Sequence, residues 1–323
     1  MSTLTTKKIS ASRAWLINPI IYLEGIKGMS VRIGINPLTW TNDDMPDLGA
    51  ETSLEQCLSE GKQAGYAGFE LGQKFPRKLE TLKPIMAKHQ LELISGWHSA
   101  RLLERSVDEE IEALQSHLTL LKGMACKVMV FAEVTECIHG DIEKPLSMRP
   151  KLSQGQWVEF GKKMTLVAQY LQKQGVRLAY HHHMGTVVET AEEIDLLMGH
   201  TGDAVGLLVD TGHLRYAGAD PVELINRYGH RIVHVHCKDV RSLTLNWALE
   251  NNVSFLTAVL EGVFTVPGDG SVDFGSVFGA LKAVDYSGWL VVEAEQDPSK
   301  AIPLAYAILG YKYLEKTVAQ VGL

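Results

Sequence analysis

The sequence predicts a single (β/α)8 TIM barrel, on three observations. Short runs rich in β-branched residues alternate with longer stretches whose apolar residues recur at helical spacing, which is the pattern of βα units and a parallel sheet. Eight such runs occur between residues 31 and 293. The 323 residues fit one large barrel or two average domains, and no repeat, low-complexity tract or Pro/Ser-rich linker divides them.

The eight predicted strands come first, because they define the barrel. Each is a short apolar run, and the polar residues gather toward its carboxyl end. In chain order the predicted strands are residues 31–35, 67–71, 91–96, 127–132, 176–183, 205–210, 231–237 and 289–293.

The predicted helices lie between and after these strands. In the stretch 108–121, apolar residues recur every three or four positions, and acidic residues enrich the first turn, where carboxylates suit the helix dipole. Several helices are expected to end at a glycine that adopts the left-handed conformation, namely Gly65, Gly123, Gly175 and Gly199. The predicted helices are residues 54–64, 79–89, 108–121, 154–174, 191–198, 221–228, 274–283 and 302–318.

Three longer stretches are predicted to be irregular loops: 36–52, 133–153 and 239–273. All come directly after strands, and in a barrel the loops after strands form the rim of the active site. They predict an enclosed small-molecule pocket. Residues 1–28 are predicted to be an N-terminal extension outside the core, and residues 29–323 the barrel domain. The apolar stretch 14–23 imitates a signal peptide poorly, because Asn and Pro interrupt it.

Composition narrows the function classes. The formal net charge is −7 and the pI is near 6.0, so the chain offers no basic surface to nucleic acid. No apolar stretch is long enough to cross a bilayer, so no membrane partner is expected. The cysteines are far apart and form no CxxC pair, which favours reduced thiols in a cytoplasmic enzyme. They are Cys57, Cys126, Cys137 and Cys237.

The ends of four consecutive strands carry residues that bind metals. His181, Asp210, His236 and Glu293 each stand at or near the end of an apolar run, and the carboxyl ends of barrel strands converge. One buried histidine alone is more often a hydrogen-bonded core residue. Four such residues at equivalent ends indicate a shared partner, and imidazole with carboxylate suits Mn²⁺, Co²⁺ or Zn²⁺ at an open, catalytic site.

Further polar residues are candidates for substrate contact or for acid–base chemistry. Lys238 shares a strand face with His236 and points into the predicted mouth, and His213 follows Asp210 across an expected glycine turn. The others lie in or just after a strand, where each can also be a salt-bridged rim residue. They are Glu70, Trp97, His98, Glu133, His183 and Glu295.

Several motifs resemble those of the xylose-isomerase-like metal barrels, a group that contains sugar isomerases, ketose epimerases and AP endonucleases. Within this group the chain is most similar to the inosose dehydratase family. The resemblance places metal ligands at His181, Asp210, His236 and Glu293, although many members carry glutamate at the first position. The motifs are NPLTWTNDDMPDLG (36–49), GFELG (68–72), YHHHMGT (180–186), DTGH (210–213), HVHCKDV (234–240), PGDGSVDF (267–274) and GWLVVEAEQD (288–297).

The resemblance implies conversion of scyllo-inosose, a cyclic polyol ketone also called 2-keto-myo-inositol, into a trihydroxycyclohexane-1,2-dione and water during inositol catabolism. It also implies Mn²⁺ or Co²⁺ as cofactor and support by glutathione. Eliminating water needs a base for the proton next to the ketone and an acid for the leaving hydroxyl. Lys238 or Glu133 is our candidate base and His213 our candidate acid. Glu70, Trp97, His98, His183 and Glu295 are candidate substrate contacts.

Three other functions stay open from the sequence. A metal-dependent sugar isomerase or epimerase would use the same chemistry up to the proton removal. An AP-endonuclease-type enzyme would need basic residues along a groove, against the acidic balance of this chain. A non-catalytic sugar- or metal-binding barrel is the third, because a fold does not fix a function. Barrels of this size often associate, so a homo-oligomer is possible.

Overall fold

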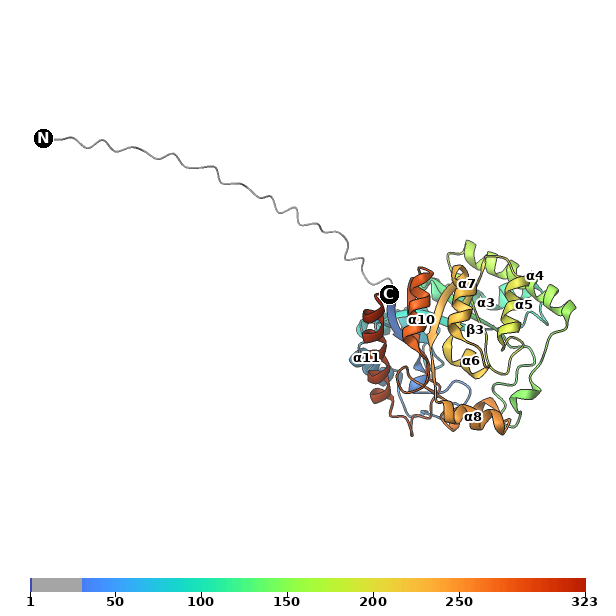
Figure 1. The fold of residues 1–323 in the computed structure, drawn as a ribbon. Helices are drawn as coiled ribbons and strands as arrows, with labels where there is room; N and C mark the ends of the chain where they lie inside the picture. The colour runs from blue at the N-terminus through green and yellow to red at the C-terminus, as the bar shows by residue number, and fades with distance from the viewer. Residues whose placement is uncertain (2–30) are drawn as a thin grey trace.

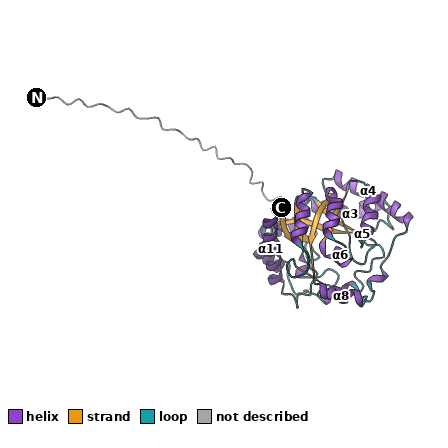
Figure 2. Ribbon diagram, viewed as in Figure 1, coloured by secondary structure: helices purple, strands orange, loops and turns teal. Residues whose placement is uncertain are grey.

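The computed structural model describes Met1 and residues 31–323, and residues 31–323 form the barrel in Figure 1. Apart from Met1, the predicted N-terminal extension at 1–28 lies outside the described residues. In Figure 2 the strands run through the middle of the molecule and helices surround them. Figure 1 shows three helices beside the strands, α7 (Pro221–Tyr228), α10 (Phe274–Ala283) and α11 (Pro303–Val321), and α8 (Ser242–Glu250) across one end of the barrel.

Eight parallel strands close on themselves in the order β1-β10-β7-β6-β5-β4-β3-β2, which confirms the predicted fold class. Closure joins the first strand to the last, with Val31 opposite Gly288 and Ile35 opposite Val292. The barrel strands are β1 (Val31–Ile35), β2 (Gly68–Leu71), β3 (Glu92–Ala100), β4 (Val128–Glu133), β5 (Arg177–His181), β6 (Val205–Asp210), β7 (Ile232–Cys237) and β10 (Gly288–Val292).

Eight long helices lie where the periodicity predicts them, with ends that shift by a few residues. Several begin at a hydrogen-bonded cap; at α3, for example, Ser106 and Glu109 form a reciprocal capping box. These helices are α1 (Leu54–Ala64), α2 (Leu79–Lys88), α3 (Val107–Gly123), α4 (Gln154–Lys173), α5 (Ala191–His200), α7 (Pro221–Tyr228), α10 (Phe274–Ala283) and α11 (Pro303–Val321).

The stretch 239–273 is not the irregular loop that the sequence predicts. Within this stretch, the short strands β8 (Asp239–Val240) and β9 (Phe264–Thr265) pair in antiparallel fashion. Helix α8 exposes Leu243 and Leu249, so the apolar residues of this helix show no clear one-sided period. A short helix also replaces the glycine turn expected after Asp210, and three single turns are 3-10 helices. The additional elements are η1 (Pro37–Thr39), η2 (Leu146–Met148), α6 (Thr211–Tyr216), η3 (Gly229–Arg231), β8 (Asp239–Val240), α8 (Ser242–Glu250), α9 (Phe255–Leu260) and β9 (Phe264–Thr265).

Two of the four predicted glycine caps are wrong. Gly65 and Gly175 have positive φ angles of 114° and 81°, as expected for left-handed residues at helix ends. Gly123 is instead the last residue of α3, and Gly199 lies inside α5, which continues to His200. A glycine near the end of a periodic stretch therefore indicates a helix end only to within a turn.

The barrel interior is polar near the carboxyl ends of the strands and apolar beneath this polar layer. Val130, Ala179 and Leu208 form a small buried cluster inside the barrel, while the outward faces of the strands pack on the helices in the main core. The polar side chains lie nearer the carboxyl ends of the strands, so these residues form a mouth above a packed floor. Among the described helices, none combines the length and the apolar character needed to span a membrane.

Candidate metal centre

Four ligand-type residues meet at the carboxyl ends of neighbouring strands. His181 ends β5, Asp210 ends β6, His236 is the penultimate residue of β7 and Glu293 follows β10 directly. Each offers one ligand atom, and these atoms lie within 4.8 Å of one another. All four residues are at most 5% exposed. The structure therefore brings together the four residues that the sequence singled out as metal ligands.

Hydrogen bonds orient both histidine rings toward the same point. The Nδ1 of His181 lies 2.6 Å from the carbonyl oxygen of His182, and the Nε2 of His236 lies 3.1 Å from Glu70 Oε2. A ring nitrogen that donates in this way leaves the other nitrogen free as a ligand. Those two other nitrogens, His181 Nε2 and His236 Nδ1, each lie 3.6 Å from Asp210 Oδ2.

Asp210 divides its two oxygens between the fold and the site. Its Oδ1 accepts a hydrogen bond of 2.8 Å from the His213 N–H and so caps α6. Its Oδ2 is buried and accepts no hydrogen bond. An unsatisfied buried carboxylate oxygen is costly. This oxygen, facing two ring nitrogens and Glu293, fits a divalent cation.

The pKa directions describe a site that binds cations. Burial lowers the pKa of His181 to about 4, so its ring is neutral, which is the form that binds metals. Burial also opposes the charged form of His236, but Glu293 and Glu70 outweigh it and raise the pKa of this ring. A metal ion at His236 would therefore displace a proton, so metal binding should strengthen as the pH rises.

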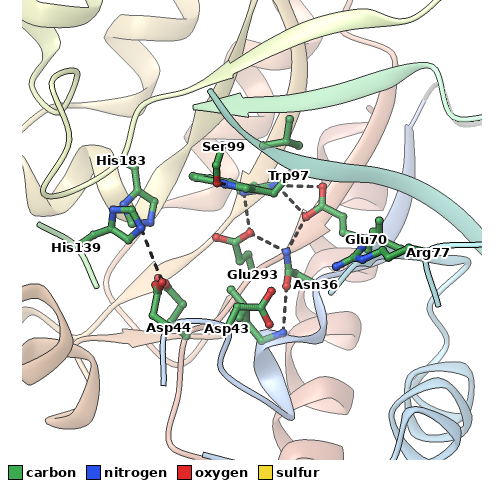
Figure 3. A pocket seen from close by; sticks show the side chains of 15 residues that line it. Asn36, Asp43, Asp44, Glu70, Arg77, Trp97, Ser99, His139, His183 and Glu293 are labelled. Atoms are coloured by element: carbon green, nitrogen blue, oxygen red, sulfur yellow. Dashed lines mark hydrogen bonds and ion pairs between the residues drawn. The ribbon is translucent and has the colours of Figure 1, made fainter. Parts of the chain in front are cut away.

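A cavity of about 270 Å³ is lined by two of the four candidate ligands, His236 and Glu293. Figure 3 shows Trp97 across one side of it and Asn36 between two carboxylates. The Nδ2 of Asn36 donates to Glu70 (2.8 Å) and to Glu293 (3.1 Å). An aromatic wall opposite several polar groups is typical of a site for a small polar ring.

Glu70 lines this cavity, but neighbouring donors already occupy its oxygens. Besides Asn36 and His236, it contacts the hydroxyl of Ser95 at 2.5 Å and the Nε2 of His234 at 2.8 Å. A carboxylate with so many partners holds the His236 ring in place. The sequence predicts a substrate contact for Glu70; its hydrogen bonds favour support of a metal ligand.

The other predicted substrate contacts divide into two groups. Trp97, His183 and Glu295 line the cavity. His98 does not, because successive residues of a strand point to opposite faces and Trp97 takes the inward position. The His98 ring packs on Phe131 and contacts Glu110 of α3. His98 thus belongs to the interface between strand and helix, which disfavours the substrate contact that the sequence predicts for it.

None of the three predicted acid–base residues is among the described residues that line the cavity. Lys238 and His213 are fully buried behind Glu295 and His183. Three carboxylates, those of Asp210, Glu293 and Glu295, outweigh burial and raise the pKa of Lys238, so it is protonated and does not fit the role of base.

His213 and Glu133 also depart from their predicted roles. Burial lowers the pKa of His213 well below its usual value, which disfavours an acid. Glu133 points outward because Val130 points inward on the same strand, and it accepts hydrogen bonds from the N–H groups of Leu102 and Thr135.

Sequence reasoning missed several residues of the cavity. Asp43 and Asp44 lie in a quoted motif, WTNDD, but its letters alone indicate no role for them. Placing such residues requires knowing how the long loop after β1 folds back over the mouth. The polar lining residues that were missed are Asn36, Asp43, Asp44, Arg77, Ser99 and His139, and the apolar ones are Leu38, Leu71 and Val130.

An eight-stranded parallel barrel with imidazole and carboxylate groups at its mouth defines a class, the TIM barrels with a candidate metal site. Comparison with family models narrows this class, since the model described as xylose isomerase-like TIM barrel matches residues 58–316. The chain belongs to this family.

Relatives of known name cover almost the whole chain. The rhizopine catabolism protein MocC of Rhizobium meliloti is 54% identical over 91% of this chain and 90% of its own length. The inosose dehydratase of Clostridium tetani is 43% identical, and that of Geobacillus thermodenitrificans is 44% identical, each over 90% of this chain and 98% of its own length.

Solved structures are similar in fold at much lower identity. An L-ribulose 3-epimerase matches with a TM-score of 0.64 and 18% identity over 90% of this chain and 95% of its own. The IolI protein with a bound zinc atom matches with a TM-score of 0.63 and 17% identity over 90% and 97% of the two chains. At these identities the likeness shows the fold alone.

Proposed function

We propose that this chain is an inosose dehydratase, a hydro-lyase that removes water from scyllo-inosose (2-keto-myo-inositol) to give a trihydroxycyclohexane-1,2-dione in inositol catabolism. The observation that carries the proposal is identity of 42–44% to proteins named inosose dehydratase, over at least 89% of this chain and 98% of theirs. The name of MocC, at 54% identity, gives rhizopine catabolism and no reaction.

His181, Asp210, His236 and Glu293 would hold a divalent ion, and their mixture of imidazole and carboxylate suits it. A bound ion would act as a Lewis acid that stabilises negative charge developing on the ketone oxygen. The protein itself would bind the ring of the cyclic polyol ketone against Trp97. The polar groups opposite, among them Asn36 and Ser99, would contact the hydroxyls of this ring.

We assign the proton transfer to Glu295. Its carboxylate lines the cavity and lies 2.6 Å from the Lys238 ammonium, which holds it in a fixed position. In this scheme Glu295 takes the proton from the carbon next to the ketone. The same carboxyl then gives this proton to the hydroxyl that leaves, so hydrogen and hydroxide depart as one water and Glu295 returns to its starting state. The enol that remains becomes the 1,2-dione when its hydroxyl proton moves to the carbon that lost the hydroxyl.

The decisive experiment measures turnover of scyllo-inosose while the bound metal is removed and restored. Purified protein is incubated with scyllo-inosose, and absorbance of the conjugated dione is followed before chelation, after chelation and after Mn²⁺ or Co²⁺ is restored. We expect turnover that disappears on chelation and returns with metal. A new inosose isomer without the chromophore would indicate an epimerase instead, and full metal occupancy without turnover would indicate a binding protein.

Glu295→Gln tests the assignment of the base. We expect turnover to fall by roughly 100-fold or more, since general acid–base catalysis contributes on that scale, while the metal content stays that of the wild type. Glu133→Gln is the matched control, because Glu133 is also a buried glutamate but lies outside the cavity lining. Equal activity in Glu295→Gln and the wild type would remove Glu295 from the reaction.

The proposal includes several expectations from the sequence. They are Mn²⁺ or Co²⁺ as the particular ion, support by glutathione, a cytoplasmic location, a homo-oligomer and the absence of nucleic acid and membrane partners. Activity assays with single metals, with and without glutathione, address the first two.

A further inference from the structure

Lys238 is a fully buried lysine whose ammonium group has a partner for each of its three N–H bonds. Its Nζ lies 2.6 Å from Glu295 Oε2, 2.8 Å from Glu293 Oε1 and 3.0 Å from His213 Nε2. The ring of Phe264 lies 4.7 Å from the same nitrogen, in position for a cation–π contact. The surroundings of this nitrogen therefore match a cation.

The same surroundings have the composition of a second metal site. His183, His213 and Glu295 are buried and offer ligand atoms within 4.8 Å of one another. Glu293 connects this group to the first centre, because its Oε2 lies 2.9 Å from His236 Nδ1 while its Oε1 faces Lys238. A carboxylate shared in this way is what would bridge two metal ions.

The contacts of the ammonium bear on what the second group holds. The carboxylates of Asp210, Glu293 and Glu295 each have an oxygen within 3.7 Å of the Lys238 Nζ. A second divalent ion among His183, His213 and Glu295 would have to lie beside this ammonium, and two buried cations side by side are costly. Without the ammonium, the same carboxylates would lose a cation partner, which is also costly.

Packing also favours the ammonium. At Gly212 a Cβ atom would come within 2.4 Å of the Lys238 Cγ, so the glycine makes room for the lysine stem. Phe255 packs on His183 and His213 from the other side. Aromatic walls supply no oxygen ligands for a metal ion and leave its waters without partners.

We propose that the Lys238 ammonium is the resident cation of a second cation site formed by His183, His213 and Glu295, so that the barrel binds one divalent ion and loss of the ammonium opens a site for another. This inference rests on the metal centre of the proposed function. It assigns Lys238 a role as a built-in cation that positions Glu293 and Glu295.

Metal stoichiometry tests the proposal independently of activity. Wild type, Lys238→Met and the control Lys163→Met are saturated with Mn²⁺ or Co²⁺, freed of excess ion and analysed for metal per chain. We expect one equivalent in the wild type and in Lys163→Met, because the Lys163 Nζ donates to the backbone carbonyls of Leu102 and Arg105, which belong to neither candidate cation site. We expect two in Lys238→Met, and one again in the double variant Lys238→Met/Glu295→Gln.

Two results would overturn the inference. Two equivalents in the wild type would show that the ammonium does not fill the second site. This result would overturn the inference even if Lys238→Met fails to fold. A folded Lys238→Met that binds one equivalent would show that no second site opens. No metal in the wild type would remove the first centre as well, and so identifies failure of the proposed function.

Discussion

Glu70 shows how one side chain can orient a candidate metal ligand without being one of the four candidate ligands. Its carboxylate contacts the Nε2 atoms of both His234 and His236, and the latter ring presents its Nδ1 to Asp210 and Glu293. The direction of the His236 ring thus depends on an acceptor from a strand on another side of the barrel, β2. Loss of a residue that fixes a ligand in this way typically weakens metal binding.

We therefore expect Glu70→Gln to weaken divalent metal binding by about 10- to 100-fold, because the amide NH₂ would face a ring N–H where the carboxylate now accepts. Competition with a chelating dye measures the affinity. Glu92→Gln serves as control, since Glu92 pairs with Arg32 at the exposed end of the barrel. Unchanged affinity in Glu70→Gln would mean that His236 needs no such partner.

For a change at Glu133 we expect a loss of stability and little effect on turnover. Its oxygens accept N–H groups from Leu102 (2.7 Å) and Thr135 (3.0 Å), so Glu133→Gln leaves one of these donors without an acceptor. We expect a loss of about 1–3 kcal/mol in the free energy of unfolding, the cost of an unsatisfied buried group, with turnover within a few-fold of wild type. Urea unfolding and the dehydration assay measure the two quantities. A loss of turnover with intact stability would return Glu133 to the reaction.

At the scale of elements, the barrel strands were easier to predict than the loops and short helices at the mouth. The four candidate ligands could be chosen from the sequence, because side chains alternate along a strand and barrel strands end at one rim. The same alternation excludes His98 and Glu133 once the inward positions of Trp97 and Val130 are known. Only the structure supplied those positions.

The loops and short helices at the mouth depend on tertiary contacts that a single sequence does not reveal. Helix α6 is six residues long and begins at the Asp210 cap, and such a short helix has no measurable period. Helix α8 carries apolar residues toward solvent, among them Leu243 at 86% exposure. The loop after β1 is held by Lys74, whose Nζ donates to three backbone carbonyls of that loop.

The packing of helix α6 can be tested by comparing one glycine in α6 with one glycine in α10. In Gly212→Ala the new Cβ would meet the Lys238 side chain at 2.4 Å, whereas at Gly279, in α10, nothing lies within 4 Å. We expect Gly212→Ala to destabilise the fold by about 1–3 kcal/mol through overpacking. Gly279→Ala should be neutral or stabilise it by up to about 1 kcal/mol, since alanine favours helix. Equal unfolding midpoints for the two variants in urea would contradict the close packing of α6 on Lys238.

At the scale of the whole molecule, the candidate metal centre draws its four residues from β5, β6, β7 and the end of β10, on one side of the barrel. A ligand that binds only the folded state stabilises it by mass action, by roughly 2.7 kcal/mol at one hundred times its Kd. We therefore expect the thermal unfolding midpoint to rise with Mn²⁺ or Co²⁺ and to fall on chelation.

Asp210→Asn provides the control for that measurement, because it removes the charge of a central ligand but keeps an oxygen to cap α6. We expect this variant to show the same midpoint with and without metal. An equal rise in the wild type and in Asp210→Asn would mean that the ion binds elsewhere.

Closure of the barrel through β1 and β10 has a consequence during translation. The strand that emerges early from the ribosome, Val31–Ile35, waits for its partner until Gly288–Val292 has been synthesised. The candidate ligands begin only at His181, and the final one, Glu293, comes directly after that closing strand. A nascent polypeptide that stops before residue 288 would therefore keep unpaired strand edges and lack a complete centre, so truncated products should be substrates for chaperones and proteases.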